Sequence, residues 1–296
     1  MGATGTGKSR LAVDLALAFG GEVINSDKIQ VHRGLDVATN KVTPAECAGV
    51  PHHLLGVAAP DEEFTAADFR REATRAARAV AARGGVPIVA GGSNSFVEEL
   101  VDGGDRRAFR EAFECCFLWV DVQLPVLHDY VVRRVDDMLA RGLVDEVAAA
   151  FDPARTDYTR GVWRAIGVPE LDACLRRRHH RRRSAGAEDD DDDEQARLLL
   201  AAAIAEIKSN TCLLACRQRA KIQRLAKMWR VVRVDATEVF RRRGAEADEA
   251  WQRLVAAPCI DAVRAFLDGD GGADDLSQLD VPMFAAPAAA AAAVAV

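Results

Sequence analysis

The sequence predicts an α/β fold in which a mainly parallel sheet lies between two layers of helices. Three observations predict it. A glycine-rich motif at residues 2–9 runs directly into a helical pattern, short apolar runs end in polar residues or glycine, and helical segments separate these runs. Such alternation around a glycine-rich loop is typical of a three-layer, P-loop NTPase-like fold.

The motif at the start of the chain fits G-x-x-x-x-G-K-[ST], the phosphate-binding loop. Its glycines let backbone N–H groups close on phosphate oxygens, Lys8 adds a mobile charge, and the Ser9 hydroxyl can bind Mg²⁺. The helix predicted at residues 10–19 would point its positive N-terminus at the same anion. We therefore expect a phosphate site with Mg²⁺ as cofactor, formed by Gly2, Ala3, Thr4, Gly5, Thr6, Gly7, Lys8 and Ser9.

Only Met1 precedes this loop, whereas such a loop normally follows a buried apolar strand. The chain therefore looks truncated, and we expect its sheet to lack the first, central strand. At the other end, residues 285–296 are rich in alanine and have little bulk. We expect a disordered tail over residues 269–296.

The composition is that of a soluble globular protein. Of the 296 residues, 49% are hydrophobic and 28% are charged, which suits one α/β domain with a smaller appendage. The net charge of −6 argues against a generally basic nucleic-acid-binding protein. No run of about 18 apolar residues looks bulky enough to span a membrane, so we expect no membrane contact. Seven cysteines without a C-x-x-C pair argue against disulfides and structural zinc.

The first strand after the loop, residues 22–27, ends in Asp27. In open α/β sheets, ligands gather at the carboxyl ends of strands, so Asp27 should lie near the phosphate loop. Residues 28–60 look irregular. A helix is then predicted from 66 to 83, with Thr65 as its N-cap and Asp68 in a capping-box position.

Two further strands are predicted before the middle of the chain. Residues 86–90 lead into a second glycine-containing turn at 91–95, and residues 117–121 end in Asp121. An apolar run followed by an acid is a weak pattern for Mg²⁺ binding. The other interpretation of Asp121 is an ordinary core strand with a terminal acid.

The middle of the chain predicts a helical lobe over the ligand face. Helical periodicity covers residues 126–151 and 195–227, with a turn-rich loop at 160–170 between them. A basic block at 176–183 and an acidic block at 188–194 predict a disordered insertion near 176–194 rather than a nucleic-acid patch. The predicted organisation is a catalytic core at 1–124, the lobe at 125–228, a return to the core at 229–268, and the tail.

The late helix carries four cations, Lys208, Arg217, Lys221 and Arg224. The last three are spaced i, i+4, i+7 and therefore share one face of the helix. If this face points outward, it is a solvated stripe; if it points inward, it can bind a polyanion. The residues alone leave both interpretations open.

Several motifs follow one another along the chain. They are Asn25-Ser26-Asp27-Lys28-Ile29-Gln30, Thr39-Asn40-Lys41, His52-His53-Leu54-Leu55-Gly56, Gly91-Gly92-Ser93-Asn94-Ser95, Arg164-Ala165-Ile166-Gly167-Val168-Pro169-Glu170, and Arg217-Gln218 with Lys221. Together they resemble the isopentenyltransferase family, over residues 2 to about 268. The resemblance implies an enzyme that moves a dimethylallyl group from its diphosphate to N6 of adenine. The turn at 93–95 and the loop at 166–170 resemble the plant adenylate branch, which makes cytokinins.

The resemblance also implies roles for individual residues. Thr4 and Arg164 would bind the donor diphosphate, a task that suits the bidentate geometry of a guanidinium. Asp27 would be the general base that accepts the N6 proton, and the alternative for Asp27 is a partner of Mg²⁺ or of a hydroxyl. The phosphates of the acceptor nucleotide would be bound by Arg217, Lys221 and Lys208.

The expected activity is transfer to ATP or ADP, less so to AMP, as the first step of cytokinin biosynthesis. One alternative is a tRNA dimethylallyltransferase, against which the acidic net charge and the absence of a visible zinc finger argue. Another is a truncated nucleotide-binding protein without activity. We expect a monomer without a nucleic-acid partner. By resemblance we expect it in the plastid, with the cytoplasm as the alternative location.

Overall fold

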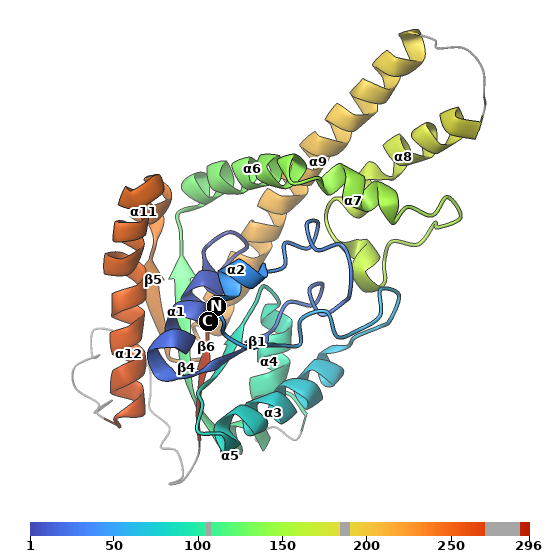
Figure 1. The fold of residues 1–296 in the computed structure, drawn as a ribbon. Helices are drawn as coiled ribbons and strands as arrows, with labels where there is room; N and C mark the ends of the chain where they lie inside the picture. Colours follow the sequence, from blue (N-terminus) through green and yellow to red (C-terminus); the bar gives the residue numbers. More distant parts are fainter. Residues whose placement is uncertain (105–107, 184–189, 270–290) are drawn as a thin grey trace.

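The computed structural model describes residues 1–104, 108–183, 190–269 and 291–296, which build a six-stranded sheet covered by helices (Figure 1). The strands lie in the order β2-β1-β3-β6-β4-β5, and every neighbouring pair is parallel. The predicted α/β class with a mainly parallel sheet is therefore confirmed. The strands are β1 (Glu22–Asn25), β2 (His52–His53), β3 (Pro87–Ala90), β4 (Phe113–Asp121), β5 (Val231–Asp235) and β6 (Ala291–Ala295).

Helices precede, separate and follow the strands, as the alternation in the sequence predicts. The core helices are α1 (Lys8–Phe19), α2 (Pro44–Cys47), α3 (Ala66–Ala82), α4 (Asn94–Asp102) and α5 (Ala108–Ala112). The lobe contains α6 (Leu124–Ala140), α7 (Leu143–Ala149), the 3-10 turn η1 (Gly161–Arg164), α8 (Val168–Arg183) and α9 (Asp190–Leu225). The chain returns with α10 (Thr237–Phe240), α11 (Gly244–Trp251), the π-helical turn η2 (Gln252–Ala256) and α12 (Ala257–Leu267).

Helices cover both faces of the sheet, and each face has its own apolar core. On one face, Leu15 of α1 and Val263 of α12 pack with Leu118 of β4. On the other face, Phe69 of α3 and Phe96 of α4 stack with ring centroids 4.6 Å apart. Strands buried on both faces must be apolar throughout, and every residue of β3 is buried.

A third core belongs to the helical lobe. Val135 of α6, Leu143 of α7, Leu171 of α8 and Ile207 of α9 pack together there and are buried. Helix α9 continues from the lobe to the sheet, where Ile222 joins the core under α3 and α4. One helix therefore carries side chains from the lobe to the edge of the sheet where β1 and β3 end.

The two charged blocks are helical wherever the structure describes them, so the expected disordered insertion is wrong for residues 176–183 and 190–194. The first block completes α8 and the second begins α9, while residues 184–189 lie outside the described part of the chain. Figure 1 shows α8 and α9 running out of the body as a pair.

One segment of α9, residues 194–225, has the length and composition of a membrane-spanning helix. Its most apolar 18-residue window has a hydropathy of 1.5 and is 17% buried. The expectation that no run reaches this range is therefore wrong. Alanine and leucine supply this hydropathy, and a single helix of this kind is weak evidence for a membrane.

The central strand, β6, is formed by residues close to the end of the sequence. It lies between β3 and β4, with Val294 opposite Ile88 on one side and Cys116 on the other. The expected gap in the sheet is thus filled, and a disordered tail is wrong for residues 291–296, whereas residues 270–290 lie outside the described ones. Alanine has a low β-propensity, but ladder hydrogen bonds on both edges and burial on both faces outweigh it.

Candidate functional site

The phosphate loop lies at the start of α1 and is closely packed. Gly5 and Gly7 have φ angles of 83° and 88°, left-handed values that favour glycine. A Cβ atom on Gly7 would lie 2.6 Å from the ring of Trp251. One on Gly2 would lie 2.9 Å from the carbonyl oxygen of Val120. The loop therefore needs its glycines both for backbone conformation and for space.

Lys8 is buried at the base of the loop, and its Nζ donates to the carbonyl of Ala3 at 2.7 Å. The pKa of Lys8 is lowered from 10.5 to about 8. Burial is the largest cause, the positive charge of Arg134 also lowers this pKa, and the carboxylate of Asp27 acts in the opposite direction. A buried ammonium that interacts with another cation is well suited to bind an anion.

Arg134, which the sequence analysis did not single out, also lies beside the loop. From α6 its Nη1 donates to the hydroxyl of Thr4 at 3.1 Å. Burial lowers the pKa of Arg134, and the carboxylate of Asp27 acts in the opposite direction. The available signal was an arginine next to buried Val135 in the apolar pattern of its helix.

Asp27 follows β1 as predicted, and its two carboxylate oxygens have different surroundings. Oδ1 accepts from the N–H groups of Ile29 at 2.9 Å and Gln30 at 3.4 Å. Oδ2 has no hydrogen-bond partner among the described residues, and it lies 2.8 Å from where a Cβ on Gly92 would be. One oxygen is thus held by the backbone, and the other is available to accept a proton.

Gln218 of α9 connects the phosphate loop to the turn that follows β3. Its Oε1 accepts from the N–H of Thr4 at 2.7 Å, and its Nε2 donates to the carbonyl of Gly92 at 2.8 Å. Asn94 donates to the carbonyl of Gln218 at 3.3 Å. The lobe helix, the loop and the turn therefore meet beside Asp27.

Lys28, Arg164 and Lys221 form a second group of cations, and Asp27 acts on Lys28 within it. Burial lowers the pKa of Lys28, the charges of Arg164 and Lys221 lower it as well, and Asp27 opposes them. The Nε of Arg164 is buried and has no hydrogen-bond partner in the described part of the chain, so it can bind a ligand oxygen. Arg164 therefore interacts with Lys28, whereas the hydroxyl of Thr4 is bonded to a different arginine, that of α6.

The cations of the late helix have different surroundings. Lys221 and Arg224 both contact Glu98 of α4, at 3.2 and 2.7 Å. Arg217 is exposed and has no partner among the residues that the structure describes. Lys208 pairs with an aspartate of α6 at 2.6 Å. An incoming phosphate would find Arg217 free and would compete with carboxylates at the other three.

Asp121 is a core ion-pair residue, and its geometry favours the structural interpretation over metal binding. It is 3% exposed. Both of its oxygens accept from Arg219, at 2.9 and 3.0 Å, and Oδ2 also accepts from Arg233 at 2.6 Å. A carboxylate held by two guanidinium groups has little capacity left for a cation.

Ser9 is the residue that fits Mg²⁺. It lies exposed in the first turn of α1, and its hydroxyl has no hydrogen-bond partner among the described residues. Mg²⁺ keeps several waters and typically binds through one or two protein oxygens together with substrate phosphates. One free hydroxyl in this loop would therefore be a sufficient protein contribution to an Mg²⁺ ion bound with a substrate diphosphate. The described part of the chain holds no group of three or more His, Cys, Asp or Glu side chains that could bind a metal.

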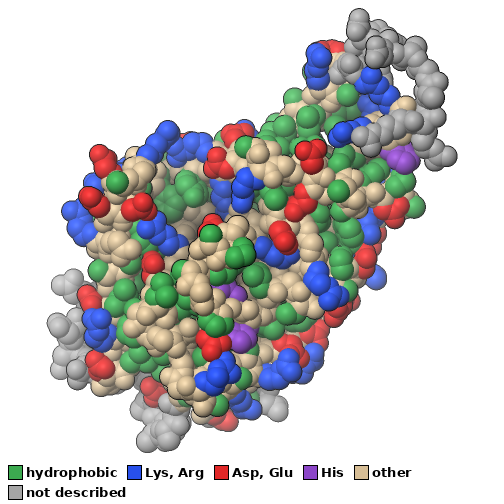
Figure 2. Space-filling model, viewed as in Figure 1, with side chains coloured by type: hydrophobic (Ala, Val, Ile, Leu, Met, Phe, Trp, Pro, Cys, Tyr) green, Lys and Arg blue, Asp and Glu red, His purple; other side chains and the backbone are tan. Residues whose placement is uncertain are grey.

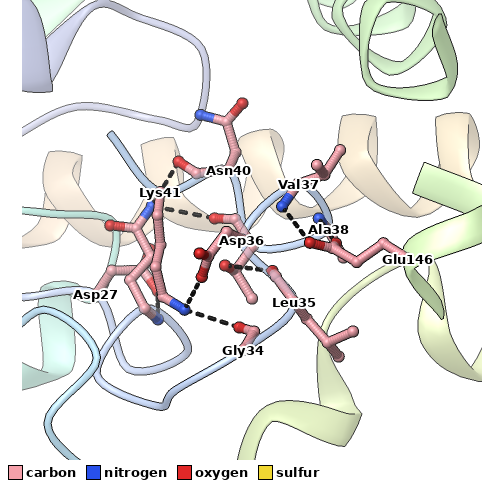
Figure 3. A network of polar contacts seen from close by, with 11 residues as sticks. Asp27, Gly34, Leu35, Asp36, Val37, Ala38, Asn40, Lys41 and Glu146 are labelled. Atoms are coloured by element: carbon pink, nitrogen blue, oxygen red, sulfur yellow. Dashed lines mark hydrogen bonds and ion pairs between the residues drawn. The ribbon is translucent and has the colours of Figure 1, made fainter. Parts of the chain in front are cut away.

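A network of hydrogen bonds links Asp27 to the helical lobe (Figure 3). Gln30, whose N–H bonds to Asp27, donates from its side chain to the carbonyls of residues 39 and 40 at 3.1 and 3.0 Å. Glu146 of α7 accepts from the N–H groups of residues 37 and 38 at 2.9 and 2.8 Å. The loop over residues 35–41 thus connects the candidate base to α7.

A cavity of about 430 Å³ lies against this loop. Lys41 on its wall has a side chain that is 8% exposed, and its ammonium contacts Asp36 at 2.6 Å (Figure 3). Arg33 and Arg141 also line the cavity. Its walls therefore carry more positive than negative charge.

Comparison with known proteins gives a consistent result. Residues 30–112 and 105–224 match the family model described as IPP transferase. The chain is 57% identical to adenylate isopentenyltransferase 5, chloroplastic, of Arabidopsis thaliana, over 90% of this chain and 78% of that protein. It is 50% identical to adenylate isopentenyltransferase 7, mitochondrial, of the same plant, over 91% and 80%. A solved eukaryotic dimethylallyltransferase acting on tRNA has a TM-score of 0.70 at 23% identity, covering 90% of this chain and 78% of that one.

Proposed function

Because this chain belongs to the IPP transferase family, we propose that it transfers a dimethylallyl group from dimethylallyl diphosphate to N6 of adenine in ATP or ADP, and less readily in AMP. It is a prenyltransferase of the adenylate type. The observation that carries the proposed chemistry is the position of Asp27, whose charge acts on Lys8 and Arg134 at the phosphate loop and on Lys28. This transfer requires a base beside a diphosphate site.

On the donor side, the bond between C1 of the dimethylallyl group and the diphosphate oxygen breaks. The leaving diphosphate gains negative charge, which the N–H groups of the loop, Lys8 and Arg134 would stabilise. Arg134 and Thr4 are already bonded to each other, so they would present a guanidinium and a hydroxyl together. Mg²⁺ bound at Ser9 would supply further stabilisation of that charge.

On the acceptor side, N6 forms the new bond to C1 and loses a proton. The exocyclic amine of adenine is a poor nucleophile, so removing this proton during the attack lowers the barrier. Oδ2 of Asp27 would accept the proton, and the backbone N–H groups of Ile29 and Gln30 hold Oδ1 in place. Phosphates of the nucleotide would be bound by Arg164, Lys28 and Arg217, together with Lys221 and Lys208 after these two leave their carboxylates.

A tRNA acceptor receives less support. The solved tRNA enzyme shares the fold at 23% identity, whereas the adenylate relatives are 50–57% identical. On the face of the molecule drawn in Figure 2, basic and acidic side chains are interspersed. Binding an anticodon arm would require a continuous basic surface.

We also propose that the enzyme works in the plastid, as a monomer and without a membrane. The chloroplastic name of the 57% identical relative supports the location, and the mitochondrial name of another leaves a second organelle as the alternative. Helix α9 buries Ile207 in the lobe and Ile222 against the sheet, which supports a role inside a globular protein.

The test is a substrate panel. The protein is incubated with dimethylallyl diphosphate, Mg²⁺ and, separately, ATP, ADP, AMP or unmodified tRNA, and products are identified by mass. We expect prenylated ATP and ADP, less prenylated AMP, and unmodified tRNA. Prenylated tRNA would show that tRNA, and not ATP or ADP, is the acceptor. If no acceptor is prenylated, the protein binds nucleotides without transferring a prenyl group.

A further inference from the structure

Arg164 is carried by the turn η1, and η1 rests on residues 58–61. The N–H of Val162 donates to the carbonyl of Pro60 at 2.9 Å. The two segments approach so closely that a Cβ atom on Gly161, whose φ is 54°, would lie 1.8 Å from this carbonyl oxygen. The position of Arg164 therefore depends on where residues 58–61 lie.

This segment is in turn held by His32. The backbone of His32 forms a parallel bridge with Ala58, and its ring nitrogen Nδ1 lies 3.0 Å from the carbonyl oxygen of Ala59. Because a carbonyl can only accept, Nδ1 carries the proton and donates. His32 also donates its backbone N–H to the carbonyl of Ile29, whose own N–H donates to Asp27. One buried residue thus joins the turn after Asp27 to the segment beneath η1.

The second ring nitrogen of His32 is an acceptor without a partner. With the proton on Nδ1, the neutral ring has a lone pair on Nε2. This atom is buried and has no hydrogen-bond partner in the described part of the chain. Burial lowers the pKa of His32, the charges of Arg164 and Lys41 lower it as well, and the carbonyl of Ala59 and the carboxylate of Glu62 raise it. The net effect is a pKa below 6.5, so the ring is neutral at pH 7.

We propose that His32 is a positioning residue for Arg164: its neutral ring fixes residues 58–61, and through them η1, so that the guanidinium can reach a substrate phosphate. The inference rests on the proposed function, in which Arg164 binds a phosphate. The Nε of Arg164 has no hydrogen-bond partner among the described residues, so no bond at this atom holds the guanidinium in place. A displacement of about 1 Å at such a site can cost about 10²-fold.

The first test separates the bond to Ala59 from the rest of the ring. His32→Asn keeps an N–H at the place of Nδ1, whereas His32→Leu removes it. Pyrophosphate with Mg²⁺ and, separately, ADP are the probes, and binding is measured by calorimetry. We expect His32→Leu to weaken, by about tenfold to a hundredfold, whichever probe Arg164→Gln also weakens. His32→Asn should bind that probe nearly as well as the unaltered protein.

The second test asks whether His32 acts through Arg164. If it does, His32→Leu causes no further loss of binding in a chain that already carries Arg164→Gln, and the two changes are not additive. A general loss of structure would weaken binding equally in both chains. Arg160→Gln is the matched control, because Arg160 is an exposed residue of the same segment. Its effect and that of His32→Leu should be additive.

The third test needs no ligand and no change at His32. Nitrogen NMR of the ring should show the proton on Nδ1, and a pH titration should give a pKa below 6.5. Arg164→Gln removes a positive charge that acts on the ring, so it should raise this pKa. Arg160→Gln should leave it unchanged. This test decides the matter if His32→Leu does not fold.

Three results would overturn the proposal. They are a proton on Nε2 in place of Nδ1, a pKa of His32 that Arg164→Gln does not raise, and additive losses for His32→Leu and Arg164→Gln. If Arg164→Gln weakens binding and the losses are additive, only the role of His32 fails. If Arg164→Gln weakens neither probe, the phosphate-binding role of Arg164 in the proposed function fails as well. No arm measures prenyl transfer, so the result is separate from that of the substrate panel.

Discussion

At the scale of residues, burial and the neighbouring charge of Arg134 both lower the pKa of Lys8. Its pKa of about 8 means that it is charged below pH 8 and loses its proton as the pH rises through that value. A bound diphosphate favours the charged form, so binding should raise this pKa, and affinity should fall above pH 8.

The measurement is an NMR titration of the Lys8 side chain, assigned by its absence in Lys8→Arg. We expect a midpoint near 8 without ligand and a higher midpoint with Mg²⁺ and pyrophosphate. A midpoint that stays in place when pyrophosphate binds would show that Lys8 does not contact the anion.

Arg134 and Arg164 are the two candidates for the guanidinium that binds the donor diphosphate. The contact of Arg134 with Thr4 favours Arg134. We expect Arg134→Lys to weaken binding of dimethylallyl diphosphate by about tenfold or more, because an ammonium cannot form two parallel hydrogen bonds. Arg133→Lys, at the exposed neighbour on the same helix, is the control. If Arg164→Lys weakens donor binding and Arg134→Lys does not, the role belongs to Arg164, as the family resemblance implies.

Which site residues the sequence could predict depends on how far apart the contacting residues lie along the chain. The residues of the phosphate loop are contiguous in the sequence, so the motif identifies all of them. Asp27 could be placed beside the loop because parallel strands end at a common edge. The contacts of Thr4 with Arg134 and Gln218 span 130 and 214 residues. No local pattern reports such contacts, and only the packing of α6 and α9 creates them.

Helix α7 acts on the site through Glu146. Glu146→Gln replaces one acceptor oxygen with an amide nitrogen that faces an N–H group of residues 37–38. We expect the free energy of unfolding to fall by about 1–3 kcal/mol, the cost of leaving such a group unsatisfied. We also expect slower turnover, because the loop that carries Gln30 is held less firmly.

Denaturant unfolding and steady-state kinetics measure these two effects. Asp145→Asn, at the exposed neighbour on α7, serves as the control. If Glu146→Gln behaves like Asp145→Asn in both measurements, the bond between α7 and the loop has no part in holding the site together.

Sequence predicted individual elements well where local chemistry decides them. Helix α3 begins at the predicted capping box, in which Asp68 N–H donates to Thr65 Oγ1 at 3.1 Å and Thr65 N–H donates to Asp68 at 3.0 Å. Charge alone was a poor guide in α8 and α9, because both charged blocks are helical wherever the structure describes them. Composition was an equally poor guide for β6. Its alanines form a strand because β3 and β4 pair with it on both sides and both faces of the sheet are covered.

For the whole molecule, the alternation of apolar runs and helices was sufficient to predict the fold class. It could not predict the order of strands, because the central position is filled by a segment from the far end of the chain. Nor could it predict that α9 joins the lobe core to the sheet core, which brings Gln218 beside Asp27 and Lys221 near Lys28. The site is therefore a product of tertiary packing around a loop that sequence alone identifies.

The central claim is that Asp27 removes the N6 proton while the phosphate loop holds the leaving diphosphate. The most direct measurement compares the unaltered protein with Asp27→Asn for transfer from dimethylallyl diphosphate to ADP, with donor binding measured in parallel. We predict that turnover falls by about 10² or more while the donor still binds, because the amide keeps the shape of the carboxylate but cannot accept the proton. Turnover that stays near that of the unaltered protein would contradict the account.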